Sequence, residues 1–167
     1  NENKIIQANS SSFYNTQLSS SAISENFLVV GEPEYNPTGK FEEGHLSVYR
    51  WDGSSWVSES LILADEYRQE GAQLGYSVAI EGDTLIAGAP GWNILNDGTG
   101  ARLNNAGRIY VFKRDSGSVW RLQKVLENPR QPTSNRSSNQ LGMRVQIANQ
   151  TILGIYHGDL REIGVWN

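Results

Sequence analysis

The sequence has 167 residues and a formal net charge of −4, with 17 glycines, 5 tryptophans, 7 tyrosines and no cysteine. A chain of this length normally forms one domain. The acidic balance argues against nucleic acid as a partner, because phosphate binding calls for a basic face. No apolar run reaches the roughly 18 residues of a membrane-spanning helix, so no membrane insertion is predicted. Many glycines and aromatic residues without a helix-length amphipathic pattern favour an all-β fold with tight turns.

The first elements in chain order are a short apolar strand at residues 3–8 and a hairpin at residues 21–33. Strands at residues 44–50 and 56–63 follow the hairpin. Consecutive strands joined by turns predict an antiparallel meander.

Residues 74–90 form the clearest hairpin of the sequence. Apolar residues alternate with small or polar ones over 76–80, a turn follows at Gly82-Asp83, and residues 84–87 form an apolar return strand. Gly88-Ala89-Pro90 ends the hairpin, because glycine permits close approach of another backbone and proline cannot donate to a ladder. We therefore expect that position 88 tolerates only glycine, because a side chain there would not fit.

Strands at residues 107–113 and 119–126 complete this second meander. A hairpin at residues 141–154 and a weaker strand at residues 162–166 begin a third copy. Three copies of one multi-strand pattern indicate a repeat architecture.

The segments LGYSVAIEGDTLIAGAP (residues 74–90) and AGRIYVFKR (residues 106–114) resemble the FG-GAP repeat, the blade motif of integrin α-chain β-propellers and of many bacterial and lower-eukaryotic secreted proteins. Leu74-Gly75 takes the place of the FG pair, and Gly88-Ala89-Pro90 is the GAP triplet. The resemblance is close over residues 74–126 and looser on either side. It implies a secreted or cell-surface segment of a β-propeller, built from four-stranded antiparallel blades.

The repeat divides the chain into about three blades. Blade 1 spans residues 13–73, blade 2 spans residues 74–140, and an incomplete blade 3 spans residues 141–167. Residues 1–12 are predicted to contribute an outer strand that completes a blade. In a meander, the loops between second and third strands lie at the same end as the links between blades, so function is expected on this long-loop face.

The loop at residues 91–106 holds the candidate binding residues Trp92, Asn93, Asn96 and Asp97. Trp92 has no counterpart in the other copies, so contact with a sugar or protein is weighed against simple anchoring of the loop. The hairpin turns lack the Asp-x-Asp-x-Asp-Gly calcium motif of the integrin relatives. One carboxylate among amides makes a poor calcium site, and a turn built by Asn-Asp-Gly is the alternative. No cofactor and no metal site are therefore predicted.

Catalytic signatures are absent from the sequence. Ser77 lies in a segment that lacks the last glycine of G-x-S-x-G, and His45 and His157 lie in different copies without matching partners. The chain is therefore predicted not to be an enzyme. Sequons at Asn9, Asn135 and Asn149 are candidate glycosylation sites, with Asn135 in the most loop-like setting.

Two functions remain open at this stage. One is a non-catalytic extracellular module, structural or adhesive, that binds protein partners or assembles with itself through its blades. The other is a lectin-like module that stacks aromatic residues of the long-loop face on sugars. Because propellers have about four to eight blades, a three-blade arc would leave apolar faces open, with residues such as Val78, Ile86 and Val111 in water. The expected partner is a second copy completing a six-bladed ring, or the remaining blades of a longer chain.

Overall fold

The computed structural model describes residues 20–36, 39, 41–62, 69–95, 102–127, 139–156 and 162–166. Every regular element within these ranges is a β-strand, so none of the described residues forms a helix that could cross a membrane. The strand predicted at residues 3–8, and with it the outer strand assigned to residues 1–12, lies outside the described residues.

Blade 1 is a four-stranded antiparallel meander of strands β1 (Ser20–Ser24), β2 (Phe27–Glu32), β3 (His45–Trp51) and β4 (Trp56–Ile62). Ser20 lies opposite Gly31 in the β1–β2 ladder. The β3–β4 ladder shifts register and leaves Glu59 as an unpaired bulge residue. A bulge changes the direction of the side chains at that point of the strand. Glu59 lies at this bulge and contacts blade 2, as described below.

Blade 2 repeats the arrangement with strands β5 (Ser77–Glu81), β6 (Thr84–Ala89), β9 (Arg108–Arg114) and β10 (Trp120–Leu126). The predicted central hairpin is formed by β5 and β6, with Ser77 opposite Gly88. The loop between β6 and β9 carries a small hairpin of its own, β7 (Ile94–Leu95) and β8 (Arg102–Leu103). The sequence pattern did not predict this hairpin, because two-residue strands are too short to show a period.

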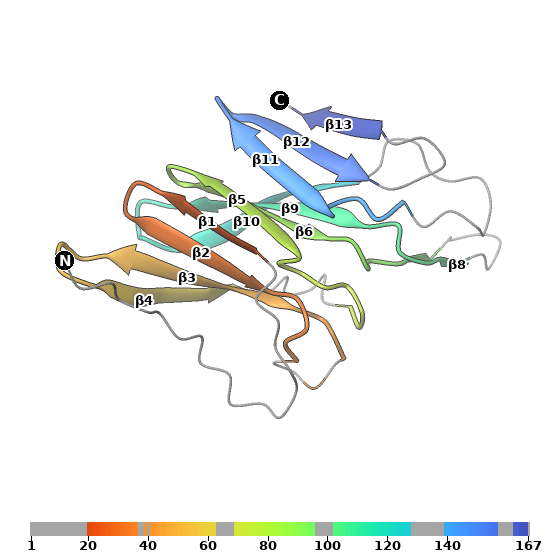
Figure 1. Ribbon diagram of the computed structural model, residues 1–167, viewed down its shortest axis with the longest axis horizontal. Coiled ribbons are helices and arrows are strands. Elements are labelled where there is room, and N and C mark those ends of the chain that lie inside the picture. Colours follow the sequence, from red (N-terminus) through yellow and green to blue (C-terminus); the bar gives the residue numbers. More distant parts are fainter. Residues whose placement is uncertain are drawn as a thin grey trace.

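Blade 3 is a three-stranded sheet of β11 (Arg144–Ala148), β12 (Thr151–Tyr156) and β13 (Glu162–Trp166), in that order. Figure 1 shows the sheets following one another in chain order, with blade 2 between the other two. The prediction of an all-β fold built from about three antiparallel propeller-type blades is confirmed.

Each blade has two faces, which we name by their neighbours in chain order. The front face of a blade points toward the following blade, and the back face points toward the preceding one. Alternate residues of each strand belong to opposite faces, as strand geometry requires. The first junction buries the front face of blade 1 against the back face of blade 2, and its fully buried residues include Val29, Leu46, Val48, Leu85, Ala87 and Tyr110. The second junction buries Ile86, Ile109, Val111, Leu126, Val145 and Ile152.

The exposed apolar residues differ from those that the sequence suggested. Val78, Ile86 and Val111 are buried, because blade 2 is covered on both faces. The open faces belong to the outer blades instead. On the back face of blade 1, Ile23 is 65% and Leu61 is 55% exposed, and on the front face of blade 3, Val165 is 59% exposed.

Candidate functional site

Trp92 anchors the long loop of blade 2. Its side chain is 9% exposed, and the guanidinium carbon of Arg108 lies 4.1 Å from the centre of its ring. The Trp92 N–H donates to the carbonyl of Ala89 at 3.2 Å, and the Gly107 N–H donates to the carbonyl of Trp92 at 3.0 Å. The ring therefore fills the base of the loop and offers little face to a ligand.

Tyr35 is the repeat counterpart of Trp92, which corrects the view that Trp92 stands alone. The Tyr35 N–H donates to the carbonyl of Glu32 at 3.2 Å, and the Gly44 N–H donates to the carbonyl of Tyr35 at 3.0 Å. The Tyr35 ring centre lies 4.2 Å from that of His45. In both blades an aromatic ring covers the first side chain of the third strand. The shared Pro-x-aromatic spacing, Pro33 to Tyr35 and Pro90 to Trp92, is the sequence signal that would have shown this.

The remaining candidates of this loop fall into two groups. The Asn93 N–H donates to Gln69 Oε1 at 2.6 Å and its Oδ1 accepts from the Asn105 N–H at 2.9 Å, so Asn93 serves the loop's internal bonding. Asn96 and Asp97 lie outside the described residues. Among the residues that are described, no group of three or more His, Cys, Asp or Glu side chains is arranged to hold a metal ion.

One of the three candidate glycosylation sites can be placed. Asn149 is exposed in the β11–β12 turn with a φ of 50°. Asn9 and Asn135, like His157, belong to the part of the chain that is not described.

The FG-GAP motif residues meet at the first blade junction. Gly75 has a φ of +91°, and a Cβ on it would lie 2.9 Å from the Cα of Gly31 and 2.7 Å from the carbonyl oxygen of His45. The hydroxyl of Ser20 donates to the carbonyl of Gly75 at 3.0 Å. The glycine of one blade's second strand thus packs directly on the glycine that begins the next blade, which requires that both lack a side chain.

The second junction repeats this contact. Gly142 has a φ of +97°, and a Cβ on it would lie 2.8 Å from the Cα of Gly88. The Ser77 hydroxyl donates to the carbonyl of Gly142 at 2.6 Å. Ser77, read from the sequence as part of a polar strand face, is buried in this junction. The close approach of Gly142 and Ser77 to Gly88 leaves no room for a side chain at position 88, which is the structural basis of the expectation that only glycine fits there.

A third contact joins the hairpin turns of neighbouring blades. The Gly82 N–H donates to Ser24 Oγ at 3.1 Å. At the equivalent place in the next junction, the Asn149 and Gln150 N–H groups donate to Glu81 Oε1 and Oε2 at 2.9 and 3.1 Å. The Gln150 and Asn149 bonds lower the pKa of Glu81 below its usual value of 4.5. In blades 1 and 2, the last residue of the first strand therefore accepts bonds from the following blade.

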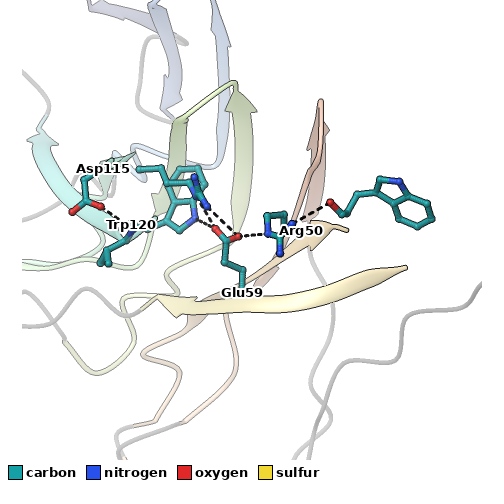
Figure 2. A network of polar contacts seen from close by, with 7 residues as sticks. Arg50, Glu59, Asp115 and Trp120 are labelled. Carbon is teal, nitrogen blue, oxygen red and sulfur yellow. Dashed lines mark hydrogen bonds and ion pairs between the residues drawn. The ribbon is translucent and has the colours of Figure 1, made fainter. Parts of the chain in front are cut away.

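Glu59 ties the outer strands of blades 1 and 2 together (Figure 2). Its carboxylate accepts from Arg114 Nε at 2.8 Å and from Trp120 Nε1 at 3.2 Å, and it pairs with Arg50 Nε at 3.1 Å. The side chain of Glu59 is 11% exposed, so these donors compensate a carboxylate largely removed from water.

A buried polar group on the back face of blade 1 has the composition of a catalytic triad but not its geometry. His45 Nε2 lies 2.7 Å from Glu32 Oε2 and 3.3 Å from Ser47 Oγ, while Ser47 also donates to Glu32 at 2.9 Å. In a triad the acid and the nucleophile contact opposite ring nitrogens, whereas here both contact the same one. Burial raises the pKa of Glu32, but the hydrogen bond and charge of His45 outweigh it and leave the pKa lowered. The group is arranged as an internal hydrogen-bonded cluster.

These features define a class of protein, a stack of propeller-type blades joined by paired glycines. The family model described as FG-GAP repeat matches residues 56–112, from β4 of blade 1 to β9 of blade 2. Residues 56–112 therefore contain an FG-GAP repeat, and the resemblance seen in the sequence is confirmed. No match was found among the curated proteins. The solved structures include a similar chain, "Crystal structure of the computationally designed Ika4 protein", with 13% identity over 92% of each chain and a TM-score of 0.36.

Proposed function

We propose that the chain is a non-catalytic extracellular module that binds protein through its open blade faces. The observation that carries this proposal is the exposure of Ile23 (65%) on the back face of blade 1, while its register equivalent in blade 2, Ile80, is 9% exposed. The same kind of position is thus covered wherever a neighbouring blade is present. An exposed apolar surface marks an interaction surface when the equivalent surface of another blade is covered by a neighbouring blade.

The partner in this proposal takes one of two forms, which are a second copy of the chain in a six-bladed ring or further blades of a longer chain. Either form gives the module a structural or adhesive role. The FG-GAP repeat at residues 56–112 supports an integrin-like, protein-binding function. A secreted or cell-surface location and glycosylation belong to the same proposal, and the exposed sequon at Asn149 supports the latter.

The lectin-like alternative receives less support from the described residues. It relied on an aromatic platform on the long-loop face, and Trp92 lies beneath the Arg108 guanidinium with 9% of its side chain exposed. A glycan array tests it directly. Sugar binding by the wild-type chain that disappears in Trp92→Ala would restore the lectin reading.

Light scattering on the full chain tests the proposal. We expect a mass above the 18.5 kDa of one chain, near twice that value for the dimeric ring. Ile23→Lys should reduce the association, because a charge on the open face opposes its burial. Val119→Lys is the matched control, since Val119 is 45% exposed but lies in the β9–β10 turn. A folded chain that stays at 18.5 kDa at every concentration would contradict the self-association form.

A further inference from the structure

A pocket of about 250 Å³ lies where β11 begins, next to the first strands of the other two blades. Figure 1 shows β1, β5 and β11 following one another in this order. Each of them is the edge strand of its sheet, and together with β12 they line the pocket. The volume is just below the roughly 300 Å³ at which pockets for drug-sized ligands begin. The pocket therefore suits a ligand about as large as one amino acid.

The residues that blade 3 contributes to this pocket depart from the repeat. The β11–β12 register pairs Arg144 with Ile155 and Gln146 with Leu153, and all four line the pocket. In blades 1 and 2 the corresponding pairs join a small first-strand residue to a glycine or a branched apolar residue, namely Ser20–Gly31, Ala22–Val29, Ser77–Gly88 and Ala79–Ile86. Arg144 and Gln146 thus replace small residues, and Ile155 replaces a glycine. The departures from the repeat are gathered at the pocket.

A backbone contact supports this correspondence between the blades. The Gly142 N–H donates to the carbonyl of Ile155 at 3.3 Å, as the Gly75 N–H donates to the carbonyl of Gly88 at 3.0 Å. At Gly88 the backbone of the next blade comes into contact, so that an added Cβ would lie 2.6 Å from the carbonyl carbon of Gly142. The side chain of Ile155 occupies the equivalent place and forms part of the pocket wall instead.

Arg144 is an exposed cation at this pocket. Arg50, Arg108, Arg114 and Arg121 each pair with an Asp or Glu side chain, whereas Arg144 has no such pair within the described part of the chain. No Asp or Glu among the described residues lines the pocket. A guanidinium binds a carboxylate through two parallel N–H···O bonds. The charge at the pocket is therefore complementary to a carboxylate.

We propose that this pocket binds a carboxylate that carries a small branched apolar group, as in the C-terminal residue of a peptide or a free acylated amino acid. Arg144 binds the carboxylate, and Leu153 and Ile155 contact the apolar group. The exposed amide of Gln146 offers a donor and an acceptor to the remaining polar groups of the ligand. This site goes beyond the proposed function, because it recognises a charged small group and does not depend on the exposed apolar side chains of blade 1.

The test is an NMR titration of the isotope-labelled full chain with N-acetyl-L-leucine. We expect saturable shifts of the amide signals of Ser77, Arg144 and Gln146, which line the pocket. N-acetyl-L-leucinamide, which lacks the charge, should bind at least tenfold more weakly. Arg144→Gln should lower the affinity for the acid by at least tenfold. Lys124→Gln is the matched control, because it removes an exposed positive charge of β10 outside the pocket, and it should leave the affinity within twofold.

A second pair of probes identifies the source of the carboxylate. A tripeptide of two glycines and a C-terminal leucine is compared with N-acetyl-L-leucine. Tighter binding of the tripeptide supports the site and assigns a peptide end, and tighter binding of N-acetyl-L-leucine supports it and assigns a free acid.

Three results would overturn the inference. The first is equal affinity for the acid and the amide. The second is an Arg144→Gln chain that keeps both the near-ultraviolet circular dichroism and the affinity of the wild type. The third is displacement of the acid by inorganic phosphate at equal concentration, because the apolar group would then contribute nothing. If Arg144→Gln changes the circular dichroism, the comparison of acid and amide on the wild-type chain decides. The mass of the wild-type chain tests the proposed function independently of these titrations.

Discussion

Replacing Gly88 by alanine tests the packing of paired glycines at the blade junctions. A Cβ at residue 88 would lie 2.6 Å from the carbonyl carbon of Gly142 and 2.6 Å from Ser77 Oγ. Gly88 has no positive φ, so the substitution adds a steric clash without backbone strain. The obstructing atoms are backbone and a buried hydroxyl, so relief requires blades 2 and 3 to move apart.

The expected loss follows from the energetics of overpacked cores. Inserting one carbon into a well-packed site typically costs about 1–3 kcal/mol. Because the main obstacle here is backbone, we expect about 2 kcal/mol or more. For a chain of this size, this corresponds to a fall in melting temperature of roughly 4–8 °C. Urea unfolding followed by tryptophan fluorescence measures the free energy of unfolding, with circular dichroism as a second probe.

Gly117→Ala is the control for this substitution. Gly117 lies in the exposed β9–β10 turn, and its added Cβ would meet only the Asp115 side chain, at 3.2 Å. Its cost should stay within about 0.5 kcal/mol, as for surface changes in general. Equal effects of Gly88→Ala and Gly117→Ala would refute the claim that close glycine packing holds the blades together.

Three further predictions concern the junctions and the metal content. Glu59→Ala should destabilise by about 1–3 kcal/mol in urea unfolding, because it leaves the N–H of the buried Trp120 ring and the half-buried Arg114 guanidinium without their carboxylate partner, whereas Gln123→Ala, at the exposed bulge of blade 2, should change stability little. Glu81 has a lowered pKa, so its contribution is present above pH 4.5 and is lost as the pH falls through the lowered pKa; Glu81→Gln should remove this part of the acid loss in unfolding midpoints measured from pH 6 to pH 2 in steps, and an unchanged acid profile would contradict it. EDTA should shift the melting temperature by less than about 2 °C, since a bound ion at 100 times its Kd would contribute roughly 2.7 kcal/mol; a fall of many degrees would indicate a metal in the loop at residues 91–106.

The strands of all three blades could be predicted from the sequence, because alternating apolar residues and turn signals are local. The central hairpin at residues 74–90 appears as β5 and β6 with its turn at Gly82-Asp83. The third and fourth strands follow within a residue or two of their predicted bounds. These features depend on side-chain period and backbone freedom, which one segment carries by itself.

Register and exposure could not be obtained in this way. Taking residues 141–154 as a copy of 74–90 ends the third copy on Gly154, but strand pairing places Ile155 at the position of Gly88. Gly154 lies one residue before the position of Gly88, and the pairing shows that the two glycines are not equivalent. Strands that are apolar on both faces also do not reveal which face a neighbour covers. For this reason Val78 and Ile86 were expected in water, whereas Ile23 is the exposed residue.

The most direct test of the account is the native mass of the assembly that contains this sequence, isolated from its natural source. The account predicts that the residues of blade 1 are found with additional blades, so that the native mass exceeds the 18.5 kDa of these residues. Mass under denaturing conditions then tells whether the added blades belong to the same chain or to a partner. A native, folded species of 18.5 kDa that remains monomeric would contradict the claim that the back face of blade 1 is an interaction surface.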